Sequence, residues 1–159
     1  MTDRVEHLAA PSEKLAAAGM ATSLAEDGET LALKGRFGVR APVLVTWERD
    51  SMLVRVEQLT KVGAGRLGDR DRRAKVLASI REEGVIAHAI VDRGRDRDGD
   101  SDGTIVFRTH LFTCADGPLE IATLGRVLAA LGDEAATALR RHVIPAGVRV
   151  TWPWKCYAE

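Results

Sequence analysis

Two adjacent segments that alternate apolar and polar residues constrain the fold of this chain more than any other feature. They read VLVTWER at 43–49 and MLVRVEQL at 52–59, and only Asp50 and Ser51 separate them. Alternation with a period of two is typical of strands that bury one face. A third alternating segment at 31–37 follows the Asp27-Gly28 turn signal. The three together predict an antiparallel meander with one solvated face.

Helices are predicted before and after this meander in the sequence. The first covers residues 4–20, and its regular part starts at Pro11. The second runs from Asp69 or Asp71 to Glu83, because an aspartate can cap its start and Gly84 can end it. The last runs from about 118 to 142, with a break at Gly132-Asp133. It carries a clean apolar stripe of Ile121, Leu124, Leu128 and Leu131.

Two further strands are predicted at 85–93 and 104–113. The expected order is therefore α-β-β-β-α-β-β-α, which makes an α+β fold. We expect an antiparallel sheet of about five strands with the helices packed on one face. Residues 1–159 form a single domain in this interpretation, and 143–159 are a candidate extended C-terminal tail.

Composition narrows the classes of partner. The 159 residues contain 23 Lys and Arg against 23 Asp and Glu, so the formal net charge is zero. Nucleic-acid binding proteins usually carry a basic excess. The zero net charge therefore disfavours nucleic-acid binding. No segment predicts a membrane span or a secretory signal, so we expect neither membrane insertion nor export, and a cytoplasmic location. The Ala, Arg and Gly content is typical of a bacterial protein.

An acidic stretch, DGDSDGTIVFRT at 98–109, resembles the first two-thirds of a calcium loop. Asp98, Asp100 and Asp102 match the first three ligand positions, and Gly103 matches the turn. Thr109 stands where the closing bidentate glutamate belongs. The alternative is a hairpin loop between two strands, and we favour it because Asp and Gly are common there. We therefore expect no bound metal.

A glycine-rich segment at 63–68 offers a second alternative. Gly63, Gly65 and Gly68 match the G-x-G-x-x-G spacing of dinucleotide sites, and Asp92 ends the next strand, where an acid would hold ribose. The preceding strand argues against a dinucleotide site, because its apolar residues alternate with charged ones. Asp69 and Asp71 would also repel a docking phosphate. We favour a plain connection and expect no cofactor, while a nucleotide-binding protein or small enzyme remains the alternative.

No set of residues indicates catalysis, and an enzyme is the less favoured interpretation. His88, His110, Cys114 and Cys156 form no clear metal or nucleophile pattern. Apolar residues without a predicted core partner point instead to a protein interface, either with another protein or in a homodimer. The interface candidates are Trp152, Trp154, Val127 and Leu53.

The layout resembles the type III secretion chaperone-like fold, in particular the YbjN-type bacterial sensory-transduction-regulator group. VLVTWERDSMLVRVEQL is similar to its central hairpin, VIAHAIVDR and DGTIVFRTHLF to its second hairpin, and LEIATLGRVLAALGDEAATAL to its closing helix. The resemblance covers about 12–142, and 93–103 and 143–159 depart from it. It implies a non-enzymatic, often dimeric, protein-binding or regulatory module with a chaperone-like fold.

Overall fold

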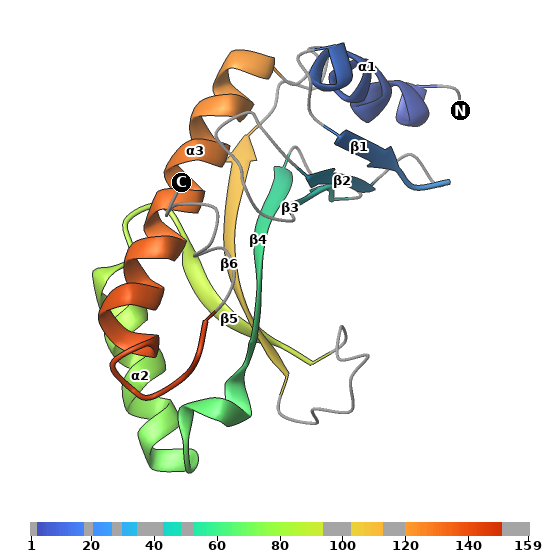
Figure 1. Ribbon diagram of the computed structural model, residues 1–159. Coiled ribbons are helices and arrows are strands. Elements are labelled where there is room, and N and C mark those ends of the chain that lie inside the picture. The colour runs from blue at the N-terminus through green and yellow to red at the C-terminus, as the bar shows by residue number, and fades with distance from the viewer. Residues whose placement is uncertain are drawn as a thin grey trace.

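The protein is an α+β domain in which three helices cover one face of a curved antiparallel sheet (Figure 1). The computed structural model describes residues 3–17, 21–26, 30–34, 43–48, 53–93, 103–112 and 120–150. Within these ranges the helices are α1 (Asp3–Ala17), α2 (Arg70–Glu83) and α3 (Ile121–Ala138). The strands are β1 (Ala21–Leu24), β2 (Thr30–Lys34), β3 (Val43–Trp47), β4 (Leu53–Gly63), β5 (His88–Asp92) and β6 (Thr104–Phe112).

The six strands lie in the order β1-β2-β3-β4-β6-β5, and every neighbouring pair is antiparallel. The predicted class and the one-sided helical layer are confirmed, with one strand more than the five expected. The additional strand is β1, which pairs with β2 across the predicted Asp27-Gly28 turn. Its sequence, ATSL, is too short and too weakly apolar to stand out as a strand.

The core lies between the helices and one sheet face. Val43, Val45, Val54 and Val56 are buried on that face, as the alternation predicts. The buried side of α3 supplies Leu124, Leu128 and Leu131, and half-buried Ile121 packs beside them. α1 covers β1 and β2, α2 lies against β5, and α3 crosses β4 and β6.

The helices differ from their predicted bounds for packing reasons. α1 begins at Asp3, eight residues before Pro11, and accommodates that proline in its interior. Leu8, Pro11 and Leu15 share one helical face and are all buried, so packing offsets the backbone hydrogen bond that proline removes. The predicted break at Gly132-Asp133 is wrong, because α3 continues to Ala138 and then into a π-helical turn at Leu139–Val143. Gly132 is buried inside this helix.

α2 begins where the sequence predicts. Asp69 caps it, since its Oδ1 accepts a hydrogen bond of 2.8 Å from the Arg72 backbone N–H. Gly84 follows its last turn, as expected. Residues at the start of the candidate C-terminal tail contact the domain: Val143 and Val148 are buried, and Arg72 Nη2 donates to the Ala146 carbonyl at 2.9 Å.

The long strand β4 contains an irregularity that Thr60 stabilises. The pairing of β4 with β6 shifts register between Leu59 and Gly63. The buried Thr60 hydroxyl donates to the Ile105 carbonyl at 2.6 Å and accepts from the Val62 N–H at 3.3 Å. One side chain therefore satisfies two backbone groups at a bulge, where ladder bonds are interrupted.

Candidate functional site

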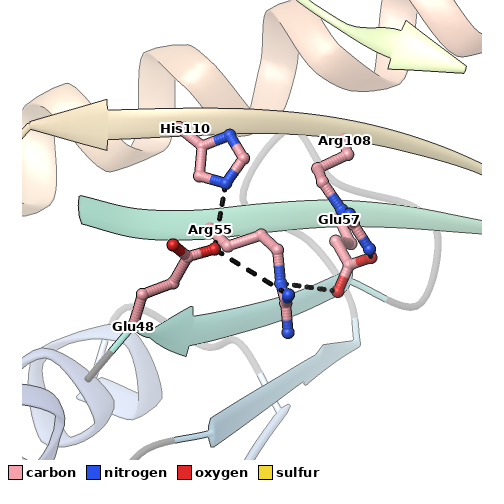
Figure 2. A network of polar contacts seen from close by, with 5 residues as sticks. All are labelled: Glu48, Arg55, Glu57, Arg108 and His110. Atoms are coloured by element: carbon pink, nitrogen blue, oxygen red, sulfur yellow. Dashed lines mark hydrogen bonds and ion pairs between the residues drawn. The ribbon is translucent and has the colours of Figure 1, made fainter. Parts of the chain in front are cut away.

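The face of the sheet opposite the helices carries a polar network, which Figure 2 shows. Its centre is Glu57 of β4, whose side chain is fully buried although it lies on this open face. Arg108 of β6 donates from Nε at 3.2 Å and from Nη2 at 2.9 Å, both to Glu57 Oε2. Arg55 Nε lies 3.3 Å from Glu57 Oε1. The carboxylate is thus held between two guanidinium groups.

The second part of the network joins three strands. Glu48, directly after β3, lies with its Oε1 at 3.0 Å from His110 Nε2 and at 3.8 Å from Arg55 Nη1. Arg55 therefore bridges the two carboxylates, as the dashed contacts in Figure 2 show. All members except Glu57 are partly exposed, so the network presents donors and acceptors to whatever approaches this face.

Strand register brings these side chains together. Glu57 lies opposite Arg108, and Arg55 opposite His110, in the pairing of β4 with β6. Residues two apart on a strand share a face, so Arg55 and Glu57 are neighbours as well. Cross-strand pairs of opposite charge stabilise a sheet modestly. The two arginines balance the formal charge of the two glutamates.

An apolar groove of about 460 Å³ lies beside this network, between α3 and β6. Ile86, Leu111, Val127 and Ala130 give it an apolar floor, and Thr109, Arg126 and His110 complete its lining. His110 therefore belongs to both the groove and the polar network. We call this feature the α3–β6 groove.

The part of β6 along this groove extends past its neighbour. The pairing of β5 with β6 ends at His88 opposite Arg108, whereas β6 continues to Phe112. On the β5 side, residues 109–112 have no strand partner within the described part of the chain. Backbone groups of alternate residues in an antiparallel strand point to the same edge, so this section offers hydrogen bonds to an added strand.

The connection between α2 and β5 shapes one end of the groove, and Glu134 of α3 fixes it. The Glu134 carboxylate accepts backbone N–H groups from Val85 at 2.5 Å, Ile86 at 3.1 Å and Ala87 at 3.2 Å. Three donors on one carboxylate form a charge-assisted cluster. The position of Ile86 in the groove therefore depends on a residue of the neighbouring helix.

A second contact ties α2 to the end of the α3 region. His142 Nε2 lies 2.8 Å from Glu83 Oε2, and Arg141 Nη1 lies 3.7 Å from the same oxygen. The hydrogen bond from His142 lowers the pKa of the Glu83 carboxyl, and the charges of His142 and Arg141 act in the same direction.

Two of the four predicted interface residues, Val127 and Leu53, belong to the described residues. Val127 lines the α3–β6 groove. Leu53 is half-buried and lies opposite Phe112, the last residue of β6. Trp152 and Trp154 fall outside the described residues. Whether any of the four contacts a partner stays a prediction.

The glycine-rich segment differs from a dinucleotide loop. Gly63 is the last residue of β4 and pairs with Thr104, and a short 3₁₀ helix (Ala64–Leu67) follows, which includes Gly65. Gly68 has φ 114°, and a Cβ there would lie 2.8 Å from Arg72 Cδ. β4 and β5, which ends at Asp92, are not neighbours because β6 lies between them. Dinucleotide folds instead pair these two strands directly.

The candidate calcium residues Asp98, Asp100 and Asp102 lie outside the described residues. The strands on either side, β5 and β6, are adjacent and antiparallel, as a hairpin requires. Thr109 lies within β6. In the described ranges, no group of three or more His, Cys, Asp or Glu side chains could hold a metal ion.

Comparisons with known proteins support the fold and do not identify a family. No family model matches the chain, and no curated protein matches it by sequence. The chain resembles the crystal structure of YbjN, a proposed transcription regulator from E. coli, with a TM-score of 0.53 and 13% sequence identity. The match covers 85% of this chain and 90% of YbjN. The resemblance inferred from the sequence is thereby confirmed for the fold. No described helix has the length and apolar character to cross a membrane.

Proposed function

We propose that this protein is a non-enzymatic regulatory module that works by binding protein, and that the α3–β6 groove binds a second copy of this chain. The observation that carries the proposal is the apolar groove directly beside a section of β6 without a described neighbouring strand. The regulatory part is supported by the shared fold with YbjN, a proposed regulator.

Exposed apolar side chains concentrate at this place. Four large hydrophobic side chains of the described residues are exposed; one of them, Ile86, lines the groove, and Val85 and Phe112 are chain neighbours of its lining residues Ile86 and Leu111. Val85 and Phe112 are 89% and 86% exposed. Single exposed apolar residues are ordinary, but clustered ones mark interaction surfaces.

A second copy fits this surface for two reasons. Two antiparallel strand edges can pair around a two-fold axis, so the same section of β6 serves both copies. The formal net charge of zero removes long-range repulsion between copies. His110 of the groove lining also belongs to the polar network on the opposite face of the sheet, where Glu48 and Arg55 supply both signs of charge that a second copy can pair with.

Sedimentation equilibrium tests the proposal with a matched pair of variants. Ile86→Asp places a charge in the groove, whereas Ile144→Asp makes the same change outside it. The two isoleucines are almost equally exposed, at 39% and 37%. We expect a dimer for the wild type and for Ile144→Asp. For Ile86→Asp we expect dimer dissociation constants raised by about tenfold or more, because the interface would bury an unpaired carboxylate. A monomeric wild type, or equal effects of the two substitutions, contradicts the proposal.

A further inference from the structure

A small cavity of about 240 Å³ lies between the end of α2, the start of β5 and the second half of α3. Figure 1 shows α2 and α3 on the same side of the sheet. The lining of this cavity shares no residue with that of the α3–β6 groove, so the two sites are distinct. We call it the α2–α3 cavity.

The floor of the cavity is apolar and belongs to the core. Ile80 of α2, Ala89 of β5 and Phe107 of β6 line it, and each is at most 3% exposed. Ala87 and Ala138 also line it, and their small side chains leave the space above the floor unfilled. An apolar cavity of about 150 Å³ can hold a benzene molecule, so this one has room for a single ring or a short alkyl chain.

Helical spacing brings polar side chains to the mouth of the cavity. Asp133, Thr137 and Arg141 stand at i, i+4 and i+8, along one side of α3 and the turn that follows it. Glu134 of α3 and Glu83 from the last turn of α2 complete the mouth. Three carboxylates therefore surround the opening together with one guanidinium group.

The three carboxylates differ in how far they are already engaged. Glu134 accepts three backbone N–H groups from the connection between α2 and β5. Glu83 contacts His142 and Arg141, which lower the pKa of its carboxyl and keep it ionised at neutral pH. Asp133 is exposed, and within the described ranges its carboxylate makes no hydrogen bond or ion pair. A cation at the mouth would meet one available carboxylate and two that are held in place.

We propose that the α2–α3 cavity binds a small organic amine, with the ammonium group at the mouth and one ring-sized apolar group on the floor. An ammonium group has three N–H donors, which suit the carboxylate of Asp133 and the hydroxyl of Thr137. The excess of carboxylates attracts a cation and repels an anionic ligand. The buried floor adds binding energy by removing the apolar group from water.

An NMR titration of the full chain tests the proposal with three ligands of similar size and different charge. At neutral pH 2-phenylethylamine is a cation, 2-phenylethanol is neutral and 3-phenylpropanoate is an anion. We expect the amine to bind with a dissociation constant on the order of 1 mM or tighter, and to shift the amide signals of residues 84–89 and 133–138. The alcohol should bind about tenfold more weakly and the anion more weakly still, because the mouth favours positive charge.

Two variants and a control assign the binding to this cavity. Asp133→Asn removes the available carboxylate and should weaken binding of the amine about threefold, the size expected for an exposed charge. Glu82→Gln is the matched control, because Glu82 is an exposed carboxylate next to Glu83 that does not line the cavity. It should bind the amine as the wild type does. Ala87→Leu places a larger side chain at a half-buried position outside the helices, and should weaken binding of both the amine and the alcohol.

The proposal is overturned if the amine shows no saturable binding up to about 10 mM, or if its shifts lie away from the cavity. It is also overturned if the alcohol binds as tightly as the amine, or if Asp133→Asn and Glu82→Gln have equal effects. Sedimentation equilibrium of Asp133→Asn should match that of the wild type, because the two sites share no residue. This measurement separates loss of the amine site from a failure of the dimer proposal.

Discussion

Replacing Arg108 by methionine tests the contact between Arg108 and Glu57, the fully buried carboxylate of the polar network. Methionine keeps an unbranched apolar stem and removes the two N–H groups that bond to Glu57 Oε2 at 3.2 and 2.9 Å. The Glu57 side chain is fully buried, so water cannot readily replace them, whereas Arg108 is 30% exposed. Hydrogen bonds to a charged group contribute about 1.5–3 kcal/mol net, and partial exposure favours the lower half of that range.

We therefore expect Arg108→Met to lower the free energy of unfolding by about 2 kcal/mol. For a domain of this size, that corresponds to a melting temperature lower by about 4–8 °C. Urea unfolding followed by far-ultraviolet circular dichroism measures the change. Arg66→Met is the matched control, because Arg66 is exposed, and its loss should cost less than about 0.5 kcal/mol.

Glu57→Gln completes a double-mutant cycle with Arg108→Met. If the two side chains stabilise the sheet through each other, the measured coupling free energy should reach about 1 kcal/mol or more. The reasoning is refuted if Arg108→Met costs no more than the Arg66→Met control. The pair would then contribute no more than an ordinary surface ion pair.

Three further changes test other contacts. Glu134→Gln should speed amide exchange at residues 85–87, measured by NMR, because it removes the charge that holds these three N–H groups; unchanged exchange would contradict this. The Glu83 carboxyl should titrate below its ordinary pKa, and His142→Gln should raise that pKa in an NMR titration. Since folding lowers this pKa, the stability from the contact is present above the unfolded-state value and is lost as pH falls through the folded value. Thr60→Val should lower the free energy of unfolding in urea by about 2 kcal/mol, because two buried backbone groups lose their partner; a loss under about 0.5 kcal/mol would show that water replaces the hydroxyl.

Local patterns in the sequence predicted the elements well where they were long and periodic. The alternation in β3 and β4 and the stripe on α3 each reflect one buried face, which a single segment already reveals. Gly132 misled the prediction for α3, because a glycine that ends one helix can lie buried inside another. The predicted range of 4–20 for the first helix is close to the observed one, but Pro11 does not start its regular part, since tertiary packing overrides a local preference.

The candidate site could be predicted only in part. Glu57 and Arg55 were recognisable as the polar side of a strand, but Arg108 and His110 join them only because β6 pairs with β4. That pairing connects segments about 50 residues apart, and nothing local specifies it. Val127 and Leu53 were identified by elimination from the core. Charged residues on the polar faces of two predicted strands were the one signal that could have indicated the network.

The most direct test of the proposed interface is hydrogen exchange along the free section of β6. Amide exchange at residues 109–112 is measured across a range of protein concentrations that spans monomer and dimer. The proposal predicts that alternate amides in this section become protected as concentration rises, because they donate to the same section of a second copy. The internal ladder between β4 and β6 should show no such change. Exchange at 109–112 that is independent of concentration, in a chain that sediments as a dimer, would place the interface elsewhere and contradict the assignment of the α3–β6 groove.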